Sequence, residues 1–521
     1  MKKFICVCMA LCVLLCFVGC KSNTETNSSF ESEHTPQSNV NAKTINLLYT
    51  YGDTFNPYTA TTSSNRQLAT LLYDSLVKTD NNFNVECVLA QSFENGNKVC
   101  TLKLRDATFT DGSAVTAEDV IYSYNLAKEN DLYKNNFYEV TSVSAVDSKT
   151  VVFNLSQYDE YFVNLITFPI VKKGTSGVTD TDGKEIAPIG CGRYYVAEDR
   201  LSFKLNNNYY GNKGVIETIN LINSPDMEST SHYVEIGATH MYYTDGDNIV
   251  RMSGKKTEVN LNRIIYIGVN SSYGSLQTKE MRYAISSALD RSAICQSAYY
   301  NNAVSAKGFF NPCFEPVSAV QTIESESNSK ITVENLAKIG YINMNSSGFY
   351  ANESGNNPEF TLLVNSENAS RVAAANLIAS QCKAAGILIN VVECSYEQYV
   401  ARLESGSFQL YLGEIQILNN MDFTNLVVSG GSAAYGVGFQ NTDNVDNEET
   451  ETLQGNPCEN IIKSYHQGEC SISDVAATLL TEMPQIPVCY LNGVLFYDSD
   501  ITNGVTASTS DIYLSIQNYE F

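Results

Sequence analysis

The stretch LLYDSLVKTDNNFNVECVLAQSFENGNKVCTLKLRDATFTDGSAVTAEDVIYSYN, residues 71–125, decides how the rest of the chain is organised. It begins with the apolar end of a helix, and an Asn-Gly turn at 95–96 precedes a strand at 99–104 in which polar and apolar residues alternate. Thr116 stands three residues before Asp119, the spacing of a capping box, ahead of apolar residues at helical spacing. The stretch therefore predicts one mixed α/β module.

Four phrases in and just beyond this stretch, LYDSLV, LAQSFE, TLKLRDATFTDG and TAEDVIYSYNLAK, resemble in order and spacing the signature of the bacterial extracellular solute-binding proteins of the peptide and nickel class, family 5. Further similarity lies at 188–195, at 278–291 and at 484–490. The resemblance implies an α/β, two-lobed fold of the periplasmic-binding-protein type, class II-like and large. It also implies an extra subdomain in the first lobe and a ligand cleft between the lobes.

The phrase PIGCGRYY at 188–195 departs from the family's Gly-Thr-Gly-Pro-Tyr phrase at Cys191 and Arg193. Gly190 and Gly192 are expected to serve a tight turn, because the third glycine and the following helix of a dinucleotide site are missing. The segment 278–291 is expected to be a capped helix that resembles a helix of the family. Asp290 and Arg291 at its end are expected to have a structural role and no catalytic one.

The first residues are typical of a processing signal. Lys2 and Lys3 precede an apolar run, and the end of that run, FVGC, resembles the lipobox of bacterial lipoproteins. We expect residues 1–19 to be a lipoprotein signal peptide and Cys20 to carry lipid. An uncleaved membrane anchor is the alternative, but the apolar run lies at the short edge for spanning. Residues 20–43 are polar and are expected to form a disordered tether.

The remaining chain divides into two expected lobes. Residues 44–263 form lobe I, with the inserted subdomain at about 71–187; residues 264–487 form lobe II; and residues 488–521 return to lobe I. Strands at 264–269 and 488–492 are expected near the crossings, and an apolar run at 158–168 is expected to be a buried helix.

From residue 360 the pattern alternates as strand, helix, strand, helix and strand, with boundaries at 360–364, 369–385, 387–392, 396–403 and 408–412. Such a run implies parallel pairing of buried strands. Ligands of open α/β sheets bind beyond the carboxyl ends of the strands, so the segment after Leu412 is expected to line the cleft.

Composition excludes several classes of partner. The 33 Lys and Arg against 57 Asp and Glu give a formal net charge of −24, which argues against nucleic acid or an anionic lipid surface. Tyrosine is abundant at 33 and tryptophan absent, so tyrosine or phenylalanine must build any aromatic ligand shelf.

Cysteine and histidine spacing predicts no metal site. The four His do not cluster with cysteines at any recognisable spacing, and of 15 Cys the first five belong to the signal and lipobox. Ten remain, and only the pairs Cys87 with Cys100 and Cys458 with Cys470 are candidates for disulfides. Free buried thiols are the favoured alternative.

The expected ligand-binding residues are chosen from strand exits and from the crossings. An Asn-Pro turn that starts at Asn56 ends the first strand and resembles the family's exit beside the cleft, although an ordinary turn explains it equally well. The full set is Asn56, Tyr58, Tyr266, Gln416, Asn419, Asp422 and Tyr490.

One position bears on the kind of ligand. Peptide-binding relatives typically hold the free α-ammonium with an Asp in a Trp-containing phrase beyond the strand that here ends at Leu412, and this chain offers Asn419 at that place. An amide brings no charge, and a charge-assisted hydrogen bond is roughly twice as strong as a neutral one. Either Glu414 or Asp422 substitutes, or the ligand is an N-blocked peptide, a sugar or another solute without an ammonium there.

The resemblance implies a monomeric substrate-binding lipoprotein of an ABC importer, with a small solute or peptide as ligand and the permease and ATPase complex as partners. It is expected on the cell membrane, held by lipid alone and facing the extracellular side or the periplasm. No cofactor and no catalysis are expected, since GxSxG, HExxH, Walker and kinase signatures are missing. The rival is a sensory or adhesive receptor of the same fold, with a hydrolase more distant.

Overall fold

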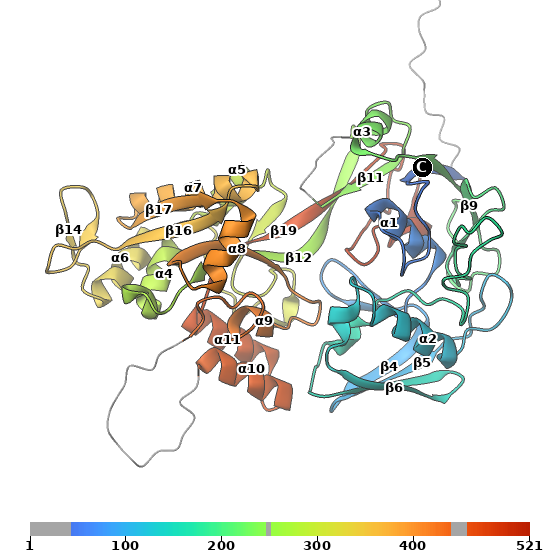
Figure 1. Cartoon of the computed structure of the whole chain (residues 1–521), viewed down its shortest axis with the longest axis horizontal. Helices are drawn as coiled ribbons and strands as arrows, with labels where there is room; N and C mark the ends of the chain where they lie inside the picture. Colours follow the sequence, from blue (N-terminus) through green and yellow to red (C-terminus); the bar gives the residue numbers. More distant parts are fainter. Residues whose placement is uncertain (1–42, 246–251, 439–455) are drawn as a thin grey trace, which may run out of the picture. The chain divides into compact units, whose positions relative to one another are not determined.

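The computed structural model describes residues 43–245, 252–438 and 456–521 (Figure 1). The signal peptide, Cys20 and the tether up to residue 42 lie outside the described residues. Among the residues that are described, no helix is both long enough and apolar enough to cross a bilayer.

The first strand belongs to a small mixed sheet. Strand β1 (Thr44–Tyr49) pairs in parallel with β10 (Thr218–Asn223), and β9 (Ser202–Leu205) and β8 (Tyr194–Val196) continue the sheet antiparallel. Helix α1 (Ser63–Leu72) contacts β1 and β8. Its buried residues join a core, called here the first core, that contains Ile45 and Leu47 of β1.

The stretch at 71–125 supplies two strands of a second, antiparallel sheet, whose order is β4 (Ala90–Gly96), β5 (Val99–Leu104), β7 (Thr150–Leu155) and β6 (Val140–Asp147). The hairpin between β4 and β5 and the capping box are confirmed. The Asp119 carboxylate accepts the Thr116 N–H at 2.9 Å and starts helix α2 (Ala117–Ala127). A short pair, β2 (Val77–Thr79) with β3 (Val85–Cys87), precedes this sheet.

The prediction of a helix at 158–168 is wrong. Only the single 3-10 turn η2 (Phe162–Leu165) forms there, and the apolar side chains around it are buried in the first core. Pro169 follows directly and disfavours helix in the residue before it. Burial on all sides, rather than a helical stripe, explains this apolar run.

Seven strands form the largest sheet. Its main path is β11 (Met241–Thr244), β19 (Ile486–Tyr497), β12 (Lys255–Val269), β18 (Leu410–Gln416), β16 (Glu359–Asn365) and β17 (Leu388–Cys394), and β13 (Ala303–Ser305) pairs with β19. Strand β16 is parallel to both β17 and β18, so the parallel run expected from residue 360 is confirmed.

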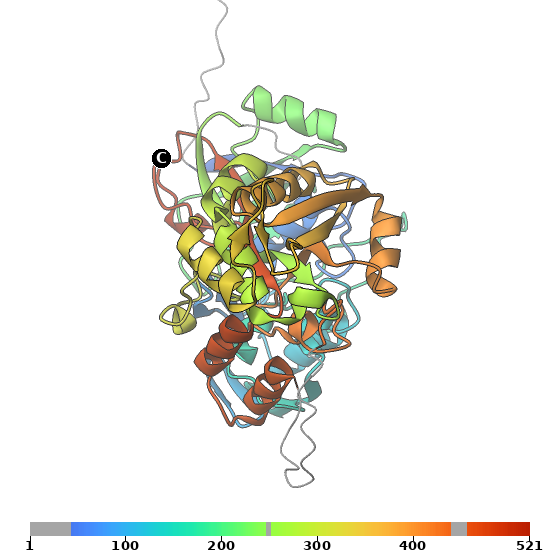
Figure 2. The same ribbon diagram turned by 90° about the vertical axis from the view of Figure 1, so that its left-hand side faces the viewer.

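Helices α7 (Ala369–Ala384) and α8 (Tyr396–Glu404) connect these parallel strands. Because right-handed crossovers run in opposite directions from β16 to β17 and from β17 to β18, the two helices must cover opposite faces. Accordingly Leu362 packs in one core with α7, and Leu363 packs in another with α8. Both helices are visible in orange in Figures 1 and 2.

The long strands β12 and β19 link the first core to the other two. Val259 and Leu495 pack in the first core, whereas Ile265 and Val488, further along the same strands, pack in the core that holds α7. A bulge between Asn260 and Arg263 interrupts their pairing. The lobe boundaries stay a prediction, but the change of core lies a few residues before the expected strand at 264–269.

The remaining elements lie mainly around the large sheet. The helix expected over 278–291 is confirmed in its first part as α4, which Thr278 caps, but α4 ends at Ala288, and Asp290 caps a separate helix that begins at Arg291. The elements are α3 (Met227–Glu235), α4 (Lys279–Ala288), α5 (Arg291–Ala298), α6 (Ser329–Lys338), α9 (Thr424–Val427), α10 (Pro457–Gln467), α11 (Ile472–Glu482), the pair β14 (Asn343–Met344) with β15 (Tyr350–Ala351), and the 3-10 turns η1 (Lys134–Phe137), η3 (Gly274–Gln277), η4 (Glu315–Val317) and η5 (Ile516–Asn518).

The ten cysteines in the described residues are all free thiols, so neither candidate disulfide forms. Gly190 and Gly192 also differ from expectation. Neither has the positive φ of a tight turn, and each instead lets the backbone approach Leu72, whose carbonyl oxygen accepts the Gly192 N–H at 2.9 Å. These glycines therefore serve close packing rather than turn geometry.

Candidate functional site

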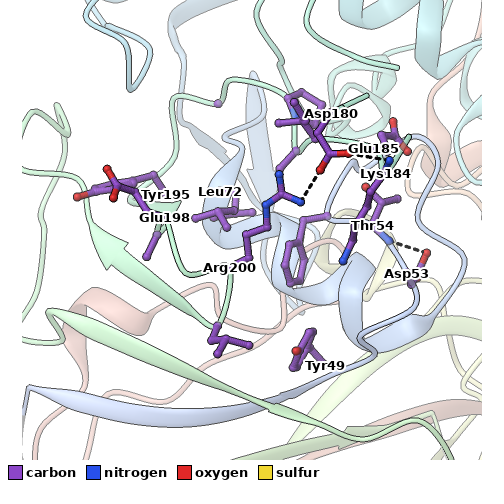
Figure 3. A pocket seen from close by; sticks show the side chains of 18 of the residues that line it. Tyr49, Asp53, Thr54, Leu72, Asp180, Lys184, Glu185, Tyr195, Glu198 and Arg200 are labelled. Atoms are coloured by element: carbon purple, nitrogen blue, oxygen red, sulfur yellow. Dashed lines mark hydrogen bonds and ion pairs between the residues drawn. The ribbon is translucent and has the colours of Figure 1, made fainter. Parts of the chain in front are cut away.

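A cavity of about 1010 Å³ lies beside the exit of the first strand (Figure 3). Its walls come from the end of β1 and the loop after it, from the loop at 180–190, and from the β8–β9 hairpin. Tyrosine and phenylalanine rings contribute to the lining, among them Tyr49, Phe55 and Tyr195. A volume of this order accommodates a peptide-sized solute.

Asp53 holds the loop that leaves β1. Its carboxylate accepts hydrogen bonds from the Thr62 N–H at 2.7 Å, from the Thr62 hydroxyl at 2.6 Å and from the Thr61 N–H at 3.0 Å. Burial acts to raise the pKa of Asp53, but these hydrogen bonds outweigh it and hold the pKa below its ordinary range. The loop is thus tied to the start of α1 by an ionised side chain.

Replacing Asp53 by alanine should lower the free energy of unfolding by about 1–2 kcal/mol, because the Thr61 and Thr62 donors lose their hydrogen bonds to a charged acceptor. Because the pKa of Asp53 is depressed in the folded protein, its stabilisation is full above the unfolded-state pKa near ~4 and is lost as pH falls through the lower folded-state pKa. Urea unfolding at neutral pH measures the loss. Asp182→Ala, at an exposed wall residue, is the matched control and should change stability by less than about 0.5 kcal/mol.

Carboxylates dominate the charge of the cavity wall. Six acidic and two basic side chains line it, and one of the cations, Arg200, is paired with Asp180 at 2.9 Å. The other cation, Lys184, stands over the ring of Tyr51 with its nitrogen 4.4 Å from the ring centroid. The excess of negative charge favours a ligand that carries a positive group.

Asn56 is buried outside the cavity and contacts one of the residues that line it. Its side-chain amide donates to the Glu185 carboxylate at 2.6 Å and to the Ser176 hydroxyl at 2.9 Å, and the Thr59 hydroxyl donates to the same carboxylate at 2.7 Å. Glu185 lines the cavity whereas Asn56 is fully buried. Asn56 therefore positions a cavity residue.

A second, smaller cavity of about 290 Å³ lies where the start of α7 meets β18 and β19. Arg371, in the first turn of α7, binds the Glu414 carboxylate at 2.6 Å, and Arg263 lies 3.5 Å from the other oxygen of Glu414. Burial acts to lower the pKa of Arg371, but Glu414 outweighs it and raises the pKa. The Tyr299 hydroxyl in this wall is buried without a hydrogen-bond partner.

None of the seven residues expected to bind ligand lines either of these two cavities. Tyr266 and Tyr490 are buried in the core that holds α8, where their hydroxyls bond to protein groups, that of Tyr490 to the Phe309 carbonyl oxygen. Tyr58 is buried as well and donates to the Pro169 carbonyl oxygen. The ligand-binding role of these tyrosines stays a prediction.

Of the three remaining expected residues, Gln416 ends β18, whereas Asn419 and Asp422 follow the strand and contact the N-terminal part of the chain. Gln416 donates to the Leu261 carbonyl oxygen at 2.6 Å, and the Asn419 amide lies 3.5 Å from the Thr79 hydroxyl. Asp422 accepts from the Tyr138 hydroxyl and from Thr424. The structure therefore brings Asn419 and Asp422 to one side of the inserted module and does not bring them to Asn56.

Sequence reasoning missed Asp53, Glu185 and Arg371. A signal existed for two of them, because Asp53 lies in the turn that follows the first predicted strand and Arg371 follows a helix-capping asparagine, Asn368. No sequence signal pointed to Glu185, because it lies in a loop in which polar and apolar residues show no periodic pattern.

Comparisons with known proteins agree with this architecture. The family model described as bacterial extracellular solute-binding proteins, family 5 Middle, matches residues 84–435. The oligopeptide-binding protein AppA of Bacillus subtilis is 26% identical over 366 residues, which cover 66% of this chain and 67% of that protein. A putative ABC transporter peptide-binding protein of Brucella ovis is 24% identical over 266 residues, 47% of this chain and 50% of its own length.

Solved structures show the same fold. The nickel ABC transporter protein from Bacillus halodurans superposes with a TM-score of 0.71 at 18% identity, covering 90% of this chain and 98% of that one. AppA from Bacillus subtilis, in complex with a nonapeptide, gives a TM-score of 0.56 at 19% identity, covering 92% and 99%. The two-lobed fold expected from the sequence is thereby confirmed, and with two thirds of its length matched by the family model the chain belongs to the bacterial extracellular solute-binding proteins of family 5.

Proposed function

We propose that this protein is the substrate-binding lipoprotein of an ABC importer and that it captures a peptide or a similar small solute. The observation that carries the proposal is the cavity beside the β1 exit, which is large enough for a peptide and combines aromatic rings with charged groups. Membership of the family supports it, and so does the similarity to AppA, an oligopeptide-binding protein. All residues that line this cavity belong to the expected lobe I, so closure of lobe II over it would be the ligand-bound state that the permease recognises.

The charges of the two cavities bear on the class of ligand. Arg371 already pairs with the Glu414 carboxylate, and Asp422 lines neither cavity. Neither carboxylate is therefore available to the ammonium group of a ligand in the larger cavity. The acidic wall of the larger cavity is the better place for a positive group, so we propose a peptide with a free N-terminus or a basic side chain that binds there.

The test is identification of the natural ligand followed by calorimetry. Native purification and mass spectrometry of what denaturation releases should yield peptides. Matched free and N-acetylated forms should then differ in affinity, with the free form at least tenfold tighter because it gains charge-assisted hydrogen bonds. Glu185→Gln should reduce that difference, and scattering should show a smaller radius in the loaded protein. A released ligand without any peptide or ammonium group would refute the ligand assignment.

A sensory or adhesive receptor is the competing function. It shares the ligand site, so binding data do not separate it from an importer. Deletion of the gene should abolish uptake of the identified ligand if the protein serves transport. Unchanged uptake would favour the receptor.

Replacing Cys20 by alanine should release the protein from the membrane or leave an unprocessed precursor. The reason is that the thiol of Cys20 is the expected point of lipid attachment, and lipid is the expected anchor. Fractionation and the mass of the mature protein measure the result. A cleaved C20A protein that stays in the membrane fraction would contradict the anchor, and Cys16→Ala is the control that should change neither property.

A further inference from the structure

Three potential metal ligands meet at a point away from both cavities. The carboxylates of Glu139 and Asp422 and the imidazole of His466 each place one ligand atom within 4.8 Å of the others. Glu139 immediately precedes β6, Asp422 follows β18, and His466 lies in the last turn of α10. The cluster therefore joins the antiparallel module to the segments that follow β18.

Glu139 brings an unsatisfied acceptor to this point. The residue is 3% exposed, and one carboxylate oxygen accepts from the side-chain amide of Gln157. The other oxygen, Oε2, is buried without any hydrogen-bond partner. A buried carboxylate oxygen that lacks a partner is costly, and a cation removes that cost.

His466 is oriented as a metal-binding histidine is. Its Nδ1 lies 3.2 Å from the Tyr158 carbonyl oxygen, an acceptor that requires the proton to sit on Nδ1. In the neutral ring Nε2 then carries a lone pair, and this atom is buried, has no hydrogen-bond partner and lies 3.7 Å from Asp422 Oδ1. A backbone carbonyl that fixes the second ring nitrogen is the usual support of a ligating imidazole.

The surroundings support positive charge at this point. Asp422 is held in place by the Tyr138 hydroxyl and by Thr424, whose N–H and hydroxyl both donate to Oδ1. Asp159 adds a third buried carboxylate, bonded to Asn420 at 2.8 Å. The carboxylates of Glu139 and Asp422 thus face one imidazole.

We propose that Glu139, Asp422 and His466 bind a divalent first-row transition ion such as Zn²⁺. One imidazole and two carboxylates are ligands that such ions accept. Bonds of about 2.0–2.2 Å to a shared ion place two ligand atoms at most ~4.4 Å apart, so only a small contraction of the cluster is needed. The ion would clamp the start of β6 to the end of α10.

The test uses the full chain, purified in detergent and freed of metal with a chelator, and Co²⁺ as a spectroscopic probe. One Co²⁺ per chain should bind and be displaced by Zn²⁺. Its spectrum should lack a thiolate-to-metal band, which separates this site from the free cysteines. Glu139→Gln and His466→Gln should weaken binding at least tenfold, and Zn²⁺ should raise the Tm of the wild-type protein by a few degrees but not that of the variants.

His232→Gln, at an exposed histidine on α3, is the matched control and should bind as the wild type does. Glu139→Gln keeps the shape of the side chain and removes a buried charge, so it should fold. Three results would overturn the site: no stoichiometric binding of Co²⁺ or Zn²⁺, a thiolate band in the Co²⁺ spectrum, or unchanged affinity in both variants. Doubly protonated His466 in the metal-saturated protein, seen by NMR, would also overturn it and would identify the cluster as an ion pair.

Discussion

Replacing Arg291 by alanine should lower the free energy of unfolding by about 3–5 kcal/mol, because it leaves several buried acceptors without donors and opens a cavity. Arg291 is 1% exposed. Its guanidinium donates twice to the Pro487 carbonyl oxygen, at 3.0 and 2.9 Å, and also bonds to the Ser286 carbonyl and hydroxyl oxygens. The side chain therefore joins α5 to the start of β19 and to the end of α4.

Urea unfolding measures this loss. Arg291→Lys retains a charge but cannot supply the planar fork, so it should fall between the wild type and the alanine variant. Arg200→Ala is the control, because its exposed pair with Asp180 is worth less than about 1 kcal/mol. A loss below 1 kcal/mol in Arg291→Ala would show that β19 does not depend on this side chain.

Gly190→Ala should be the most damaging change at the cavity wall, with a loss of about 3 kcal/mol or more. A Cβ at residue 190 would lie 2.1 Å from the Leu72 carbonyl oxygen and 2.7 Å from the ring of Tyr73. The backbone atom cannot move aside as the end of a flexible side chain can. Since Gly190 and Tyr73 both line the cavity, the wall must shift together with the end of α1.

Thermal unfolding and ligand calorimetry on the same sample measure the two effects, and we expect a lower Tm together with weaker binding. Gly96→Ala is the matched control, because nothing lies within 4 Å of a Cβ there. If Gly190→Ala had the same Tm and ligand affinity as Gly96→Ala, neither stability nor ligand binding would depend on the close approach of residue 190 to Leu72.

Local sequence signals predicted much of the fold. Alternation and capping residues located the β4–β5 hairpin, the α2 capping box and the parallel run of β16, β17 and β18, because these signals depend on neighbours in the chain. The same reasoning wrongly predicted a helix at 158–168, where the apolar residues are buried on all sides and their spacing is not periodic.

The site was less predictable for a physical reason. A strand exit shows where the chain leaves the sheet but not which face a side chain occupies, so Tyr266 and Tyr490 were selected although they point into a core. Charged groups that meet in space, such as Arg371 with Glu414, are far apart in the sequence and leave no local pattern. The class of function was inferred from the resemblance to a family, because hydrophobic periodicity and helix-capping residues indicate structure and not function.

The last residues of the chain complete the first core, and this has a consequence for the order in which the protein can fold. Ile501, Tyr513 and Tyr519 pack in that core, and Asp511 binds Lys78 at 2.6 Å. Ribosomal synthesis runs from the N-terminus, and contacts between distant residues form late. The first core cannot reach its final packing until residues 501–519 have been synthesised, so the N-terminal elements stay without a complete core until then.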